Sequence, residues 1–139
     1  MFYELADLLD LAGELPFKSG SYRKVAQSLH DLDEPFADIV KENQFEKIPG
    51  AGKAIKEKLI ALVETGSIPA LEKWRKHELA SFYPWLEALN LPPRPLGILA
   101  RKFQAKDFKD LVNKLKGYDI KNLTGQSKAT ANAIIKSKQ

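Results

Sequence analysis

One stretch joins a tight turn to a helix and decides the fold: Ile48-Pro49-Gly50-Ala51-Gly52-Lys53-Ala54-Ile55-Lys56-Glu57-Lys58-Leu59. Pro49 fixes its φ angle, whereas Gly50 and Gly52 reach positive φ without steric cost, so the first five residues predict a turn. From Gly52 onward, apolar residues recur at helical spacing until Gly66. A glycine-rich turn that leads into a helix gathers unpaired backbone N–H groups at the positive end of the helix dipole. Such an arrangement binds anions, and phosphate is the commonest large one.

The rest of the sequence also predicts helices. Apolar residues recur at helical spacing in segments of about 8–16 residues, and no stretch shows period-two alternation. We therefore expect an all-α fold, a compact helical bundle with helix-hairpin-helix motifs and two small subdomains.

Capping residues indicate where these helices begin and end. Gly13 should end the first helix, which carries Phe2, Leu5, Leu8 and Leu9. Ser19 or Ser21 should cap a second helix, and Asp33 should cap a third, because short polar side chains accept bonds from the first free N–H groups.

Composition excludes several classes of site. The chain of 139 residues has no cysteine, which rules out disulfides and thiolate metal sites, and its two histidines are too few for a zinc site. No apolar run approaches the length of a bilayer span, and the start lacks the layout of a signal peptide. We expect an intracellular protein, cytoplasmic or nucleoid-associated, that does not bind a membrane.

Charge is unevenly distributed along the chain. Residues 1–47 have a net charge of −5, residues 48–90 of +1 and residues 91–139 of +8. The basic second half should attract polyanions such as DNA, although a solvated lysine-rich surface would have the same composition.

The turn and its flanks resemble a known family. An apolar-Pro-Gly-x-Gly pattern followed by a lysine-bearing helix with a Thr-Gly end resembles the hairpin of a helix-hairpin-helix DNA-binding unit. Together with Gly20-Ser21-Tyr22-Arg23-Lys24-Val25-Ala26-Gln27-Ser28 and Leu71-Glu72-Lys73, it resembles the amino-terminal lyase domain of family X DNA polymerases, the DNA polymerase beta family. The resemblance implies a lyase-like helix-hairpin-helix domain at residues 1–77. Residues 78–139 would then form a second helical subdomain with degenerate helix-hairpin-helix units.

The resemblance also implies an activity. In that family this domain binds the 5′-phosphate end of a DNA gap and can remove a 5′-deoxyribose phosphate. Only 18 residues follow Lys121, too few for a polymerase palm, so we expect no polymerase activity from this chain by itself.

Lys58 is the strongest catalytic candidate. Its helical neighbours one turn away on either side are all apolar, so no carboxylate shares its ridge. Partial desolvation and the nearby positive charge of Lys53 both favour the neutral, nucleophilic amine. From the residues alone, a lysine that extends from the edge of a core stripe is the alternative. In the family this position is the lysine that forms a Schiff base with the abasic sugar.

The resemblance extends to other site residues. Tyr22 falls on the tyrosine that positions the sugar phosphate, although it could also be an ordinary core tyrosine, and Lys18 falls on a lysine that contacts the 5′-phosphate. Lys24 could contact a backbone phosphate or belong only to the charged surface. The remaining phosphate-binding candidates of this region are Arg23, Gly50, Gly52, Lys53 and Lys56.

Several positions depart from the family pattern. Phe17 replaces a histidine that stacks on template DNA, and phenylalanine can stack as well. Ala54, Ser67 and Ala70 replace basic residues, so we expect weaker phosphate binding than the family shows.

The second half repeats the hairpin theme in degraded form. In Leu91–Phe103, Pro93 and Pro95 occupy the expected glycine places, and proline has no backbone N–H, so we favour plain helix–turn–helix packing there. Near the end, Gly125 and Lys128 are candidates for phosphate binding, with Ser127 as a cap for the last helix.

Three functions follow. The first is sequence-independent DNA binding in DNA repair, with gapped or nicked DNA and DNA-repair proteins as partners, because phosphate contacts need N–H donors and cations. The alternatives are a 5′-deoxyribose-phosphate or abasic-site lyase, and a protein-interaction domain. We expect that no cofactor is required. The resemblance implies a monovalent cation, Na⁺ or K⁺, held by the backbone carbonyls of Ile48, Gly50 and Lys53.

Overall fold

Every regular element in residues 1–137, the part of the chain described by this computed structural model, is a helix, and no strand occurs among them. The predicted all-α fold is therefore confirmed. The chain folds as two compact units, which we describe separately. The first contains Met1–Ala6 and Leu15–Lys76, and the second contains Asp7–Glu14 with the chain from His77 onward. The expected division had placed Asp7–Glu14 with the first subdomain.

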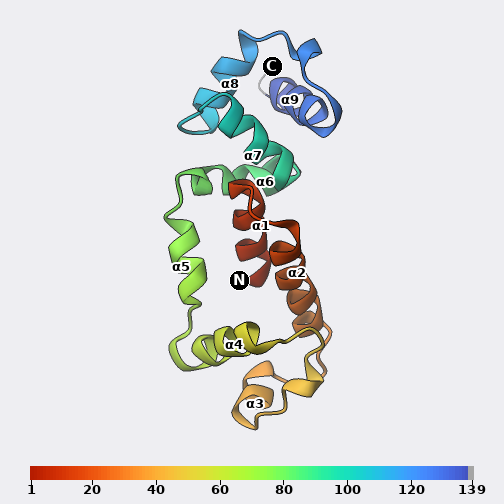
Figure 1. The fold of residues 1–139 in the computed structure, drawn as a ribbon, viewed down its shortest axis with the longest axis vertical. Helices are drawn as coiled ribbons and strands as arrows, with labels where there is room; N and C mark the ends of the chain where they lie inside the picture. The colour runs from red at the N-terminus through yellow and green to blue at the C-terminus, as the bar shows by residue number, and fades with distance from the viewer. Residues whose placement is uncertain (138–139) are drawn as a thin grey trace. The chain divides into compact units, whose positions relative to one another are not determined.

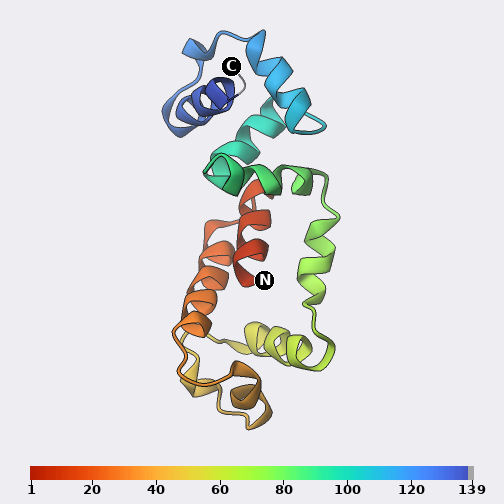
Figure 2. The same ribbon diagram turned by 180° about the vertical axis from the view of Figure 1, so that it is seen from behind.

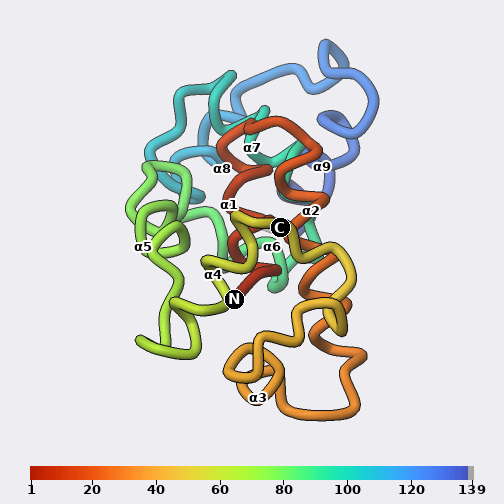
Figure 3. Tube along the Cα trace, turned by 60° about the horizontal axis from the view of Figure 1, so that its bottom comes forward, coloured from red at the N-terminus to blue at the C-terminus, as the bar shows by residue number. Residues whose placement is uncertain are grey.

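The first unit carries the turn. Its helices α1 and α2 lie side by side, and the chain then runs through α3 into the turn and α4 (Figures 1 and 3). Helix α1 also extends into the second unit. The elements are α1 (Phe2–Ala12), α2 (Pro16–His30), α3 (Phe36–Lys41), the 3₁₀ helix η1 (Phe45–Lys47), α4 (Lys53–Thr65) and α5 (Pro69–Arg75).

The ends of α1 and α4 are confirmed. Gly13 and Gly66 follow these helices with φ angles of 81° and 79°, in the left-handed region that glycine adopts without strain. The N–H of Gly66 donates to the carbonyl of Leu62 at 2.9 Å and so closes α4.

The predicted caps of α2 and α3 are wrong. Helix α2 begins at Pro16, earlier than expected, because proline lacks an N–H and has a φ angle suited to the first turn. Ser19 and Ser21 lie inside the helix, where their hydroxyls donate to the carbonyls of Pro16 and Phe17. Neither α2 nor α3 has a side-chain cap, so Asp33 does not cap α3.

Polar contacts join the elements of the first unit around its apolar core. The Tyr3 hydroxyl donates to Gln27 at 3.1 Å, which ties α1 to α2. Arg75 donates two hydrogen bonds to the Glu4 carboxylate, at 2.7 and 2.9 Å, which ties α5 to α1. The hydrogen bond from Arg75 lowers the pKa of Glu4. These hydrogen bonds therefore connect α1 to both α2 and α5.

The second unit is a separate helical cluster. Helix α9 packs against α7 and α8 (Figure 2). Trp85 stacks on Phe108 with ring centroids 4.2 Å apart, joining α6 to α8. The elements after α1 are η2 (Glu78–Phe82), α6 (Tyr83–Ala88), α7 (Pro93–Lys102), α8 (Phe108–Lys116), η3 (Ile120–Asn122) and α9 (Gly125–Ser137).

Two prolines and one serine show whether the second half contains further hairpin motifs. Pro93 and Pro95 both lie in the first turn of α7, so this segment is a helix start rather than a phosphate-binding turn. Ser127 is not a cap, because α9 already begins at Gly125.

A partly buried ion pair and a close backbone approach hold α7 to residues 7–14. Arg94 donates to Asp10 at 2.6 Å and to the carbonyl of Glu14 at 2.7 Å, and Asp10 is only 5% exposed. Gly97 packs directly on Leu11: a Cβ placed on Gly97 would overlap the Leu11 carbonyl oxygen and lie 2.8 Å from its carbon. Only glycine permits this approach.

Within residues 1–137, no helix is long and apolar enough to span a membrane.

Gly97→Ala should destabilise the second unit by about 1–3 kcal/mol, because the added methyl group meets backbone that cannot rotate away. The thermal midpoint should fall by about 4–8 °C for each kcal/mol lost. Gly117→Ala is the matched control, since a Cβ there has no neighbour closer than 3.9 Å. Equal melting temperatures for the two variants would contradict the close approach of α7 to Leu11.

Candidate nucleic-acid interface

The turn between η1 and α4 has the features of a type II β-turn. The N–H of Ala51 donates to the carbonyl of Ile48 at 3.2 Å, with Pro49 and Gly50 at the two central positions. Gly50 has a φ angle of 89°, which a type II turn requires at its third residue. The predicted turn therefore exists, and both Pro49 and Gly50 are exposed.

Helix α4 begins directly after this turn without a side-chain cap. Gly52 is its N-cap residue, and the first helical bond runs from the N–H of Lys56 to the carbonyl of Gly52 at 2.8 Å. The N–H groups of Lys53, Ala54 and Ile55 precede that bond and have no intrahelical acceptor. With the helix dipole, they leave a positive partial charge at this end of α4.

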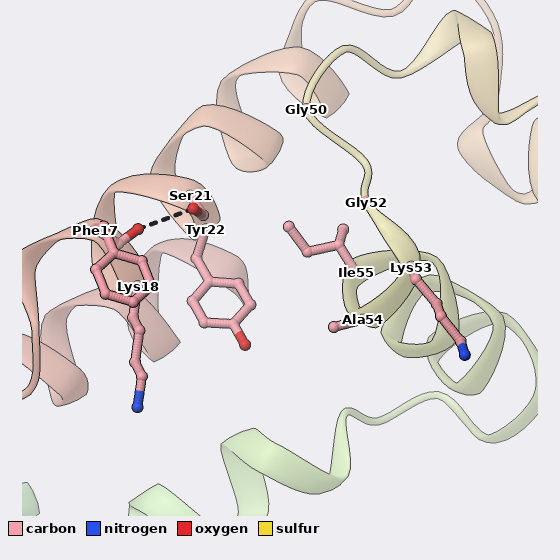
Figure 4. Close-up of a pocket in the computed structure, with 9 residues that line it drawn as sticks. All are labelled: Phe17, Lys18, Ser21, Tyr22, Gly50, Gly52, Lys53, Ala54 and Ile55. Atoms are coloured by element: carbon pink, nitrogen blue, oxygen red, sulfur yellow. Dashed lines mark hydrogen bonds between the residues drawn. The ribbon is translucent and has the colours of Figure 1, made fainter.

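The start of α4 opens into a hollow of about 370 Å³ between α2 and the turn. Figure 4 shows the two walls: Tyr22 points from α2 into the space, whereas the Lys53 amine on the opposite wall points away from Tyr22. Five predicted site residues line this hollow. They are Lys18, Tyr22, Gly50, Gly52 and Lys53. The other lining residues are Phe17, Ser21, Ala54 and Ile55.

Lys58 lies one helical turn beyond Ala54 and contacts the same tyrosine. Its ammonium nitrogen is 5.6 Å from the centroid of the Tyr22 ring, and both side chains are half-buried. The Tyr22 ring also stacks on Phe2 at 6.0 Å, which fixes it against α1. The two predicted catalytic residues, which are 36 positions apart in the sequence, therefore lie together in the structure.

Two α2 residues that the sequence did not single out as supports hold the turn in place. The Ser28 hydroxyl lies 2.9 Å from the carbonyl oxygen of Pro49 and 3.0 Å from that of Lys24, so its proton is shared between them. The aliphatic carbons of Lys24 lie 3.2–3.5 Å from the position of a Cβ on Gly50. A serine one turn after a lysine gives no sequence signal of this kind, because the contact spans 21 residues.

Lys56 and Arg23 do not line the hollow that contains Tyr22. Lys56 lies over the Phe45 ring, with 5.5 Å from its nitrogen to the ring centroid. It lines a second hollow on the other side of the turn, with Ile48, Pro49 and Gly50. Arg23 follows Tyr22 on α2 and is half-buried.

The carbonyls predicted to hold a monovalent cation fit that role in part. Ile48 and Gly50 both line the second hollow, and each carbonyl accepts one bond within the turn, from Ala51 and Gly52, which leaves a second lone pair. Lys53 is the first residue of α4, so its carbonyl points along the helix axis and away from the turn. The cation therefore stays a prediction that Ile48 and Gly50 support better than Lys53. No cluster of His, Asp and Glu in the described part of the chain could hold a metal ion.

The last two predicted phosphate-binding residues lie in the second unit. Gly125, with a φ angle of 59°, begins α9, and Lys128 follows in its first turn. Both are exposed. Their part in phosphate binding stays a prediction.

Comparison with known proteins supports the turn as a nucleic-acid element. Residues 1–68 match the family model of a helix-hairpin-helix domain, so the first half of the chain contains a helix-hairpin-helix region. Such a region suggests nucleic-acid binding. No curated protein matches the chain.

Gly50→Ala and Gly52→Ala should differ sharply. Alanine at position 50 adopts positive φ at a cost of about 1–2 kcal/mol and displaces the Lys24 side chain, whose nearest carbon lies 3.2 Å from the new methyl group. Position 52 has a φ angle of −78° and no atom within 4 Å of an added Cβ, so Gly52→Ala is the control. We expect a lower thermal midpoint only for Gly50→Ala, and identical midpoints would contradict the turn geometry.

Proposed function

We propose that the first unit binds DNA through its backbone phosphates, without preference for sequence. One observation carries this proposal: the uncapped start of α4 opens into the hollow that Lys18 and Lys53 also line. Backbone N–H groups with a helix dipole and nearby cations are the groups that hold phosphate oxygens. Because phosphates are the same in every sequence, contacts of this kind position DNA without reading bases.

The lysines around the turn support this proposal, since they are not neutralised by the protein. No carboxylate lies within ion-pair distance of Lys53, Lys56 or Lys58 in residues 1–137, whereas Lys47 pairs with Glu34 at 3.0 Å in the same unit. Cations left without a carboxylate keep their full attraction for DNA. Gly125 and Lys128 in the basic second unit would add further phosphate contacts.

A 5′-phosphate at a gap or nick is the DNA feature that suits this site best. A terminal phosphate carries more charge than an internal one and can enter a concave site end-on. Phe17 lines the same hollow and is 67% exposed, so its ring is free to stack on an unpaired base beside the gap. Together with the resemblance to family X polymerases, this supports a role in intracellular DNA repair.

DNA binding can be measured by fluorescence anisotropy on a labelled gapped duplex with a 5′-phosphate. With about four phosphate contacts, affinity should fall on the order of 100-fold between 50 and 200 mM salt. Intact duplex should bind more weakly. Lys53→Glu should weaken binding further, whereas Lys41→Glu makes the same change of charge at a residue that lines neither hollow beside the turn. Affinity that does not respond to salt would favour a protein-interaction domain instead.

A second candidate function is a 5′-deoxyribose-phosphate lyase, and the Lys58–Tyr22 contact favours it. The Lys58 amine would attack the C1′ aldehyde of the sugar and lose water to form a Schiff base. Loss of a proton from C2′ would then break the C3′–O3′ bond and leave a 5′-phosphate on the DNA. The Tyr22 ring, held by Phe2, would position the sugar beside the amine.

Borohydride trapping tests this candidate directly. Reduction of the Schiff base on a 5′-incised abasic duplex should cross-link the wild-type protein to DNA, and Lys58→Ala should abolish the cross-link. Lys56→Ala, at saturating DNA, should keep it, because that amine lies over Phe45 instead. A wild-type protein that binds this DNA without forming a cross-link would rule out the lyase and leave DNA binding standing.

A further inference from the structure

Lys24 lies on the α2 side of the turn, and the sequence left open whether it contacts a phosphate or belongs only to the charged surface. We propose that Lys24 is a phosphate-binding residue of this site, brought to the turn by Gly50 and held in register by Ser28. This inference rests on the proposed DNA binding and adds a cation contributed by α2.

The position of the Lys24 amine follows from its carbon chain. Its Cγ, Cδ and Cε lie 3.3, 3.2 and 3.5 Å from the position of a Cβ on Gly50, so the chain runs across the glycine. The ammonium is one bond beyond Cε and therefore lies at the edge of the turn. A side chain at Gly50 would displace it, so the glycine serves both the turn and this contact.

Ser28 fixes the register between α2 and the turn. Its hydroxyl lies within hydrogen-bond distance of Pro49 in the turn and of the Lys24 carbonyl one turn earlier on α2. The same hydroxyl thus connects the backbone that carries Lys24 to the backbone that precedes Gly50. A lysine whose stem is already packed loses less conformational freedom when it binds a phosphate than a free surface lysine does.

The charge of Lys24 is available to bind an anion. It is exposed, and it makes no ion pair with a carboxylate within residues 1–137. Lys24 lines neither hollow beside the turn, but its stem crosses Gly50, which lines both. Because the Lys53 amine on α4 points away from Tyr22 (Figure 4), Lys24 adds positive charge to the turn from the α2 side.

Lys24→Met tests this proposal, because methionine keeps the apolar stem over Gly50 and removes the charge. Removing one phosphate contact should weaken binding to gapped DNA roughly three- to ten-fold and lower the slope of log affinity against log salt by about 0.7–0.9. Lys24→Arg should retain the wild-type slope. Lys41→Met is the matched control and should change neither quantity, and melting temperatures should show that all variants stay folded.

Ser28→Ala tests the positioning role separately. It should weaken DNA binding more when Lys24 is present than when it is combined with Lys24→Met, because the part of its effect that acts through Lys24 is lost with the charge. An unchanged salt slope for Lys24→Met, with salt-dependent binding by the wild type, would overturn this inference alone. Loss of salt dependence in the wild type would instead overturn the proposed DNA binding.

Discussion

The site depends on one constraint: the third residue of the turn must be a glycine, because its backbone lies in the left-handed region. Gly50, with its φ angle of 89°, reverses the chain within four residues and delivers it to the start of α4. A residue with a Cβ would be strained there, and a longer loop would bring its own side chains in front of the helix. The result is a helix start without a side-chain cap, and the first three residues of the helix, whose N–H groups have no intrahelical acceptor, line one hollow.

Helix α2 provides the second half of the same site. Its amino-terminal part places Phe17, Lys18 and Tyr22 on one wall of the hollow, and its later turns hold the backbone of the turn through Ser28 and Lys24. Phe2 and Tyr22 connect this helix to α1. The amides of α4 therefore face side chains whose positions are set by a different helix, which is how a site between two elements acquires a defined geometry.

Most of the helices could be predicted from the sequence, because apolar spacing and glycine stops are local signals. The ends of α1 and α4 agree with Gly13 and Gly66. Three of the predicted caps failed for a shared reason. Ser19, Ser21 and Ser127 lie inside helices that had already begun at a proline or a glycine, and the hydroxyls of Ser19 and Ser21 donate to carbonyls there. Asp33 instead lies before α3, whose N-cap position is occupied by Pro35. A cap requires extended backbone at that residue, and sequence spacing does not determine this.

By itself, the sequence determined the turn, the helix that follows it and the grouping of Gly50, Gly52 and Lys53, since all of these lie within a few residues of one another and follow from local backbone preferences. Tertiary structure alone decided which distant residues meet there. The contact of Lys58 with Tyr22, the bond from Ser28 to Pro49 and the packing of Lys24 on Gly50 each join segments more than 20 positions apart. Such contacts depend on how whole helices pack on a shared core, which spacing along the chain does not encode.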